Sequence, residues 1–295
     1  MPPDSPLLLA VPNVSEGRED RRLLELAGGF GSARLLDLHA DPDHNRSVLT
    51  LAARQGELAP GLVAGARAAV ERIDMAGHAG VHPHVGAIDV IPVVHLDAER
   101  RGAAIAEALT AAARIGHELE LPVFLYGALA TTPEHTERAD LRRGGPETLS
   151  KRIAAGELQP DFGPPRVHPT AGAALVTARP PLVAFNVDLD TDDVELARRI
   201  AAGIRESGGG FPGVRAIGLM LKQRGCVQVS MNVHDHQAVP LRDLVEAVRE
   251  QASIAEAELV GLAPRAAFDG FPEDVPLRAF DPERHLIENA LRSIA

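Results

Sequence analysis

The stretch LVAFNV at residues 182–187 decides the fold, because it repeats an arrangement found at the start of the chain. There, the apolar residues 6–12 lead to Asn13, much as residues 182–187 contain Asn186. Each run precedes an amphipathic segment that ends at consecutive glycines, Gly28-Gly29 in one case and Gly208-Gly209-Gly210 in the other. Glycines in this position commonly close helices. Both apolar runs are therefore predicted to be strands that open equivalent halves of the chain.

The first half alternates predicted strands and helices. Leu58, Leu62, Ala66, Val70 and Ile73 recur every three or four residues and predict one buried helix face. The predicted elements are strand 6–12, helix 18–27, strands 34–38 and 46–53, helix 57–75, strand 87–95, helix 97–120 and strand 122–126. Residues 128–172 are rich in proline, glycine and charge, so we expect loops with short helical pieces.

The second half gives a similar series. The predicted elements are strand 182–187, a helix from 191 to 204, a hairpin of strands 214–221 and 226–233, a helix over 241–248 and strand 259–262. Both halves thus read β-α-β-β-α-β, which is the ferredoxin-like order. We predict an α+β protein of two ferredoxin-like subdomains, 1–178 and 179–295, with a ligand groove between them. Chance similarity of element order is the alternative to a duplication.

The composition restricts the class of partner. The formal net charge of −11 over 295 residues opposes binding to nucleic acid and to anionic membranes, although arginines gathered locally could still bind a small anion. Cys226 is the only cysteine, which excludes an internal disulfide and a thiolate metal cage. The N-terminus lacks a basic segment followed by a long apolar run, so we expect a cytoplasmic protein.

The segment HAGVHPHVG at 78–86 is the leading candidate for chemistry. Gly80 and Gly86 bracket it, and Pro83 favours an extended backbone at His82. An imidazole titrates near neutral pH, so it can accept and donate a proton within one turnover. One alternative is a metal site, although neither a carboxylate nor a cysteine nearby completes a zinc signature. The other is a surface loop with incidental histidines.

Three further polar segments are candidates for binding. In DPDHNR at 41–46, Arg46 could hold a substrate carboxylate in a bidentate pair, or the segment could be an ordinary Asx turn. The proline-rich run at 160–172 could form a rigid wall for a flat ligand or a stiff linker. Alternation from 228 to 233 places Gln228, Ser230 and Asn232 on one strand face, which could line a cleft or face solvent.

Familiar nucleotide and hydrolase motifs are missing from the sequence. It contains neither a GxxxxGK[ST] phosphate loop nor a GxGxxG after a strand, and it has no GxSxG elbow. Cys226 falls inside a predicted strand, so we expect it in the core rather than acting as a nucleophile.

Seven of these segments occur together in a characteristic order. They are VPNVSEG at 11–17, residues 35–47 with Asn45-Arg46, residues 78–92, PVFLYG at 122–127, PDFGP at 160–164, AFNV at 184–187 and QVSMN at 228–232. Together they resemble the glutamate formimidoyltransferase (glutamate formiminotransferase) family from Val11 to Asn232, and the last sixty residues match less clearly. The resemblance is to a stand-alone transferase without the cyclodeaminase domain that some members carry.

The resemblance implies transfer of a formimidoyl group from N-formimidoyl-L-glutamate to tetrahydrofolate, with tetrahydrofolate as co-substrate, no metal, and a homodimer. The family's catalytic histidine falls on His82. Its folate-contacting segment falls on Gly163, Pro164, Pro165, Arg166, Val167, His168, Pro169, Thr170, Ala171 and Gly172. Further substrate-binding candidates are Asp37, His39, Asn45, Arg46, His84, Gln228, Ser230 and Asn232. His39 and His84 depart from some members, which have an acidic residue and an arginine there.

One imidazole suffices for this chemistry. N5 of tetrahydrofolate attacks the amidine carbon, and a proton must leave N5 and reach the departing glutamate nitrogen. Two other functions stay open at this point: transfer of a formyl group from N-formylglutamate, and folate binding without catalysis.

Overall fold

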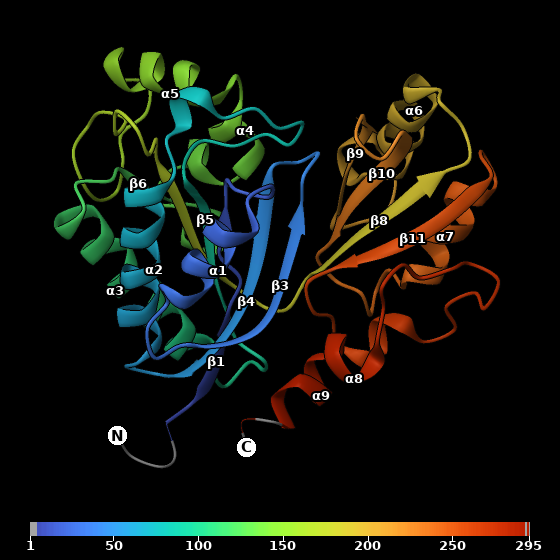
Figure 1. Cartoon of the computed structure of the whole chain (residues 1–295), viewed down its shortest axis with the longest axis horizontal. Coiled ribbons are helices and arrows are strands. Elements are labelled where there is room, and N and C mark those ends of the chain that lie inside the picture. Colours follow the sequence, from blue (N-terminus) through green and yellow to red (C-terminus); the bar gives the residue numbers. More distant parts are fainter. Residues whose placement is uncertain (1–4, 293, 295) are drawn as a thin grey trace. The chain divides into compact units, whose positions relative to one another are not determined.

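The computed structural model describes residues 5–292 and 294, and the chain divides after Pro180 into two compact units, each with its own sheet (Figure 1). The predicted α+β class is confirmed. Among the described residues, none of the helices is both long and apolar enough to span a membrane.

Unit 1 holds the first of the two sheets. Its strands are β1 (Leu7–Ala10), β2 (Asn13–Val14), β3 (Arg34–Asp41), β4 (Arg46–Arg54), β5 (Ile88–Val94), β6 (Val123–Leu125) and β7 (Ala174–Arg179). Its helices are α1 (Asp20–Gly28), α2 (Leu58–Arg72), α3 (Arg101–Glu118), α4 (Arg138–Arg142) and α5 (Gly145–Ala154), with short 3₁₀ helices at Met75–Gly77, Gly127–Leu129 and Pro133–His135.

The sheet of unit 1 is built around an interrupted strand. β1 and β2 both pair antiparallel with β4 on one side and β5 on the other, and β3 pairs with the outer edge of β4. Beyond β5 the sheet continues with β7 and β6, which run parallel to one another and to β5.

A plain β-α-β-β-α-β order for this half was therefore an incomplete prediction. The elements β1-α1-β3-β4-α2-β5 follow it, but α3, β6, α4, α5 and β7 extend it. Parallel strands need long crossover connections, and α3 and the α4–α5 segment provide them. β7 was missed because the short run ALVTAR at 174–179 follows a long irregular stretch.

Helices cover the two faces of this sheet differently (Figure 1). The larger core packs α1, α2 and α3 against one face, with Phe30, Leu62 and Ile115 among its buried side chains. A smaller core on the other face packs α4 and α5 against β5, β6 and β7 through Phe124, Leu149 and Leu175. The smaller core brings the chain between β6 and β7, which carries α4, close to β5.

Unit 2 follows the predicted element order more simply. It contains β8 (Val183–Leu189), α6 (Val194–Ile204), β9 (Val214–Leu221), β10 (Cys226–Val233), α7 (Leu241–Arg249), β11 (Ile254–Val260), α8 (Pro282–His285) and α9 (Ile287–Arg292), with 3₁₀ helices at Glu206–Gly208 and Arg265–Phe268. Its sheet is antiparallel throughout, in the order β11-β8-β10-β9. The predicted hairpin is confirmed with its bounds.

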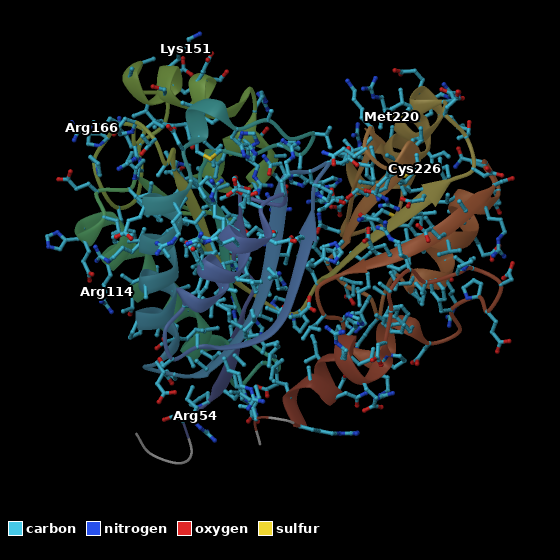
Figure 2. All side chains as sticks on the ribbon, in the orientation of Figure 1. Arg54, Arg114, Lys151, Arg166, Met220 and Cys226 are labelled. Atoms are coloured by element: carbon cyan, nitrogen blue, oxygen red, sulfur yellow. The ribbon has the colours of Figure 1, made fainter. Side chains whose placement is uncertain are left out.

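Two details of unit 2 correct the sequence predictions. The last strand spans Ile254–Val260 rather than 259–262, and its first part was missed because Glu256 and Glu258 interrupt its apolar pattern. Cys226 is not in the core: it is partly exposed at the first position of β10, on the strand face opposite the buried Val227 and Val229 (Figure 2).

Candidate active site

A bulge in β5 sets up the site by redirecting Asp89. Asn13 pairs with Val90 and Val14 with Ile88, so Asp89 is an extra residue on its strand. Bulges of this kind re-aim side chains and occur often beside active sites. The carboxylate of Asp89 is completely buried, and its Oδ1 accepts a hydrogen bond from the backbone N–H of Val85 at 2.8 Å.

Two buried arginines share the other oxygen of Asp89. Arg46 Nη1 lies 2.6 Å from Asp89 Oδ2, and Arg142 Nη2 donates to the same oxygen. The pKa of Asp89 falls to about 2: burial alone would raise it, but the charges of Arg142 and Arg46 and the hydrogen bonds outweigh that effect. Asp89 is therefore a fixed anion that orients two cations.

Asn13 completes the fixing of Arg46. Its amide nitrogen donates to the carbonyl of Val11 at 2.8 Å, which leaves its oxygen to accept from Arg46 Nε at 3.0 Å and from Nη2. Arg46 was predicted to hold a substrate carboxylate, and the structure adds that it is largely buried and already bonded on two sides. A lysine could not reproduce this planar set of contacts.

The His82 loop is held at its start by the turn between β3 and β4. Val81 N donates to the carbonyl of Asp43 at 3.2 Å, and Asn45 Nδ2 donates to the carbonyl of Ala79 at 3.3 Å. A Cβ on Gly80 would lie 2.1 Å from the carbonyl oxygen of His44, so only glycine allows this close approach.

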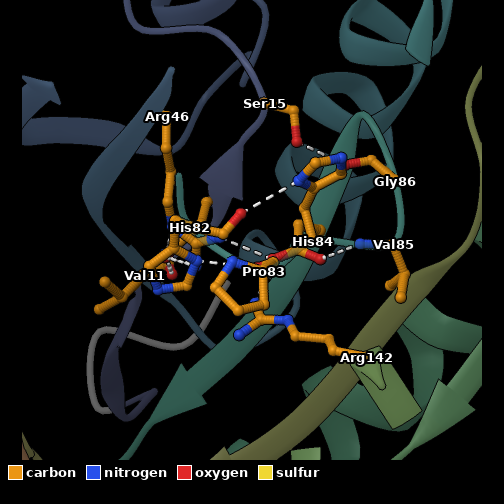
Figure 3. A network of polar contacts seen from close by, with 11 residues as sticks. Val11, Ser15, Arg46, His82, Pro83, His84, Val85, Gly86 and Arg142 are labelled. Atoms are coloured by element: carbon orange, nitrogen blue, oxygen red, sulfur yellow. Dashed lines mark hydrogen bonds and ion pairs between the residues drawn. The ribbon is translucent and has the colours of Figure 1, made fainter. Parts of the chain in front are cut away.

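The loop is held at its end by the segment just before β7. Gly86 bridges to Gly172, Ala87 N donates to Ala171 O at 2.9 Å, and Ala173 N donates to Val85 O at 3.0 Å. Ser15 Oγ also donates to Gly86 O at 2.8 Å (Figure 3). Three predicted segments, 41–46, 78–86 and the end of 163–172, are therefore brought together within unit 1.

The tautomer of His82 follows from one hydrogen bond. Its Nδ1 lies 2.8 Å from the carbonyl of Pro83, which can only accept, so Nδ1 carries the proton. Nε2 is then the nitrogen with the lone pair. Although the residue keeps some accessible surface, surrounding protein desolvates the charged ring, and this burial together with the charges of Arg46 and Arg142 holds the pKa of His82 well below its ordinary value. The resting imidazole is neutral at pH 7.

The neighbouring histidines form a separate contact. The rings of His78 and His84 meet edge to face with centroids 4.4 Å apart, and His84 Nδ1 donates to the carbonyl of His82 at 3.1 Å. Burial, followed by the charge of His84, lowers the pKa of His78 to about 4. His78 Nδ1 therefore accepts from Asn45 Nδ2 at 3.2 Å as a neutral ring.

The remaining predicted residues of unit 1 are spread around this centre. Asp37 and His39 lie on β3, the edge strand, and both are partly exposed. Gly163 packs against Leu121 and Gly116, away from the bridge at Gly172, and Arg166 extends outward from the unit (Figure 2). Within 163–172, His168 Nδ1 accepts from Ala171 N at 3.0 Å and closes a tight turn.

The predicted polar face of β10 belongs to unit 2. Val229, Met231 and Val233 are buried in its core, so the alternation is confirmed, with Ser230 and Asn232 partly exposed on the opposite face. Gln228 is completely buried, and its Nε2 donates to Asp188 Oδ1 at 2.8 Å. Its Oε1 is buried without a hydrogen-bond partner among the described residues, and its binding role stays a prediction.

Sequence reasoning missed Arg142 and did not assign a role to Asp89 or Asn13. A charged residue inside the apolar strand segment at 87–95 was a usable signal for Asp89. Arg142 gave none, because it sits beside Arg143 in a polar stretch. Among the described residues, no group of three or more histidine, cysteine, aspartate or glutamate side chains is arranged to hold a metal ion.

The sequence of this chain is similar to known proteins of one family. Residues 7–179 match the model of the formiminotransferase domain, N-terminal subdomain, and residues 184–269 match that of the formiminotransferase domain. Glutamate formimidoyltransferase of Streptococcus pyogenes serotype M1 is 37% identical over 95% of this chain and 97% of its own length. The same-named protein of Thermoplasma acidophilum is 36% identical over 98% of both chains. Formimidoyltransferase-cyclodeaminase of Mus musculus is 35% identical, and the match covers 51% of its length.

Proposed function

This chain belongs to the formiminotransferase domain family, and we propose that it transfers the formimidoyl group of N-formimidoyl-L-glutamate to N5 of tetrahydrofolate. The products are 5-formimidoyltetrahydrofolate and L-glutamate. The reaction belongs to one-carbon metabolism and to histidine degradation.

The geometry of His82 carries the proposal. Its Nδ1 proton is committed to the carbonyl of Pro83, so Nε2 is available as a base. The loop around it is held by backbone contacts at both ends, so Nε2 is not needed to hold the loop in place. A site that only bound folate would not need a titratable group held in this way.

Proton transfer by His82 follows from this arrangement. N5 attacks the amidine carbon, and Nε2 takes the proton from N5 as the C–N5 bond forms. The resulting imidazolium then donates that proton to the glutamate nitrogen as the original C–N bond breaks, which returns His82 to its neutral form. General acid–base catalysis of this kind contributes roughly 10²- to 10⁴-fold, and holding the two substrates in contact contributes further.

The binding roles of the surrounding segments belong to the same proposal. We assign the folate to the segment Gly163–Gly172, of which Gly172 bridges directly to the end of the His82 loop. We assign the donor to the side of Arg46 and Asn45, with Asp37, His39 and His84 as neighbours that shape the site. Ferredoxin-like subdomains, a cytoplasmic location and a homodimer complete the proposal, and sedimentation equilibrium tests the last.

The deciding experiment mixes the pure protein with tetrahydrofolate and N-formimidoyl-L-glutamate and follows 5-formimidoyltetrahydrofolate. We expect turnover by the wild type, and none above background by His82→Gln, which should still bind tetrahydrofolate in a titration. His117→Gln is the matched control, because His117 is exposed on α3. Full turnover by His82→Gln would show that His82 is not catalytic. If the wild type turned over N-formylglutamate faster than N-formimidoyl-L-glutamate, the proposed donor would be wrong.

A further inference from the structure

The centre of unit 1 contains more buried positive charge than the described residues neutralise. Among the residues that the structure describes, Asp89 is the one carboxylate in ion-pair contact with either Arg46 or Arg142. Both of its oxygens already accept hydrogen bonds, Oδ2 from both guanidiniums and Oδ1 from Val85 N. Two cations therefore share one anion where water is largely excluded, and a buried charge without its own partner is costly.

Arg142 shows the excess most clearly. Its side chain is 5% exposed, and its Nε is buried without a hydrogen-bond partner among the described residues. Burial lowers the pKa of Arg142 to about 9, although the charge of Asp89 raises it; the charges of Arg138 and Arg46 lower it further. The guanidinium is therefore still charged at neutral pH. A group in this state is prepared to bind an anion.

The position of this excess charge relates it to catalysis. Arg46 and Arg142 approach the His82–Pro83 turn from opposite directions (Figure 3). Their charges act directly on the imidazole of His82. The site is also not sealed, since the Arg46 side chain is 10% exposed. An anion bound by this pair would therefore lie beside the proton-transferring ring.

We propose that Arg142, together with Arg46, binds the α-carboxylate of the glutamate donor and thereby determines donor specificity, with Asp89 as the positioning residue for both guanidiniums. This inference rests on the proposed transferase function. The α-carboxylate is the natural choice because it is attached to the same carbon as the nitrogen that receives the proton from His82. The side-chain carboxylate lies farther from that nitrogen by two additional carbon atoms.

The test compares donors and variants together. N-formimidoyl-L-glutamate is assayed beside its α-amide, N-formimidoyl-L-isoglutamine, and its γ-amide, N-formimidoyl-L-glutamine. Arg142→Gln should lower kcat/KM for the diacid on the order of 10- to 100-fold, as expected for a lost charge-assisted hydrogen bond, and should have little further effect on the α-amide. The preference for the diacid over the α-amide should nearly disappear. Arg142→Lys should restore part of it.

Arg143→Gln is the matched control, because Arg143 is the next residue, is 74% exposed and pairs with Asp140. An equal loss for all three donors in Arg142→Gln would overturn the proposal and leave Arg142 a structural role. If Arg142→Gln instead lost the preference for the diacid over the γ-amide, Arg142 would bind the side-chain carboxylate and the proposal would fail. It would also fail if the variant changed only KM for tetrahydrofolate and this change vanished with tetrahydropteroate, because Arg142 would then bind the glutamate of the folate. If the wild type turns over no donor, the transferase function itself fails, which is a different result.

A second measurement on the wild type covers the case in which Arg142→Gln does not fold. The imidazole of His82 is titrated by NMR with N-formyl-L-glutamate bound and folate absent, and again with the α-amide of that ligand. The bound α-carboxylate should raise the pKa of His82, because it compensates the charges of Arg46 and Arg142, and the α-amide should raise it less. Equal values with the two ligands would refute the proposal.

Discussion

Replacing Asp89 by asparagine tests the charge network at its centre. The substitution keeps the size of the side chain and an oxygen for the N–H of Val85, but it leaves Arg46 and Arg142 buried without a counter-charge. Removing one partner of a buried ion pair typically costs about 3–5 kcal/mol. We expect unit 1 of Asp89→Asn to be less stable by that amount at pH 7.

The pH dependence of this loss follows from the pKa of Asp89. A folded-state pKa of about 2 against the ordinary 3.8 stabilises the fold above pH 4, and this contribution disappears as pH falls through the folded-state value. A tenfold change in proton affinity corresponds to about 1.4 kcal/mol, so the wild type should lose about 1 kcal/mol of the Asp89 contribution to its unfolding free energy by pH 3 and about 2 kcal/mol by pH 2. The stability difference between wild type and Asp89→Asn should therefore narrow on acidification.

Tyrosine fluorescence during urea unfolding is a suitable assay. The chain has one tyrosine and no tryptophan, and Tyr126 is buried in the smaller core of unit 1, so the signal reports on that unit. Asp97→Asn is the control, because the side chain of Asp97 is 47% exposed and pairs with a partly exposed Arg100, a contact expected to contribute less than about 1 kcal/mol. Wild-type stability of Asp89→Asn at pH 7, or a difference that does not change between pH 5 and pH 3, would refute the reasoning.

Three further results are expected. Gly86→Ala should slow turnover and destabilise unit 1 by about 1–3 kcal/mol, since the new Cβ would lie 2.0 Å from Ala173 O, whereas Gly77→Ala has open space and should behave as wild type in both assays. Arg46→Lys should raise KM for the donor, because lysine cannot contact Asn13 and Asp89 together; an unchanged KM would remove it from the donor site. The kcat/KM for the donor should stay level as pH falls past 6.5, because the pKa of His82 lies well below that value and its neutral form is the base; an acid limb at 6.5 would contradict this.

Local pattern was sufficient for elements with a strong period. The hairpin of β9 and β10 has the predicted bounds, and α2 lies inside its predicted range, because alternation and helical spacing are short-range signals. β7 was not found, because its place in the sheet depends on parallel pairing with β5 and β6. The resemblance to a family identified His82 as the catalytic candidate, which spacing alone could not do.

The contacts around His82 could not be predicted from pattern, because they join distant parts of the chain. Gly86 was predicted to end the His82 loop and Gly172 to end the folate-contacting segment, but the bridge between them has no local signature. Arg142 and Arg143 are adjacent and identical in type, yet one is buried beside Asp89 and the other is mostly exposed. Only the bulge at Asp89 and the packing of α4 distinguish them.

The low pKa of His82 would be a disadvantage for a base acting alone, because a weak base removes a proton from N5 less readily. Burial depresses this pKa most, and the charges of Arg46 and Arg142, the groups proposed to bind the donor, lower it further. Donor binding would therefore compensate the part of the depression that comes from these two charges, so the imidazole would gain basicity when the formimidoyl group is in place. On this view, the excess of buried arginine and the neutral histidine are two parts of one device that couples substrate binding to proton transfer.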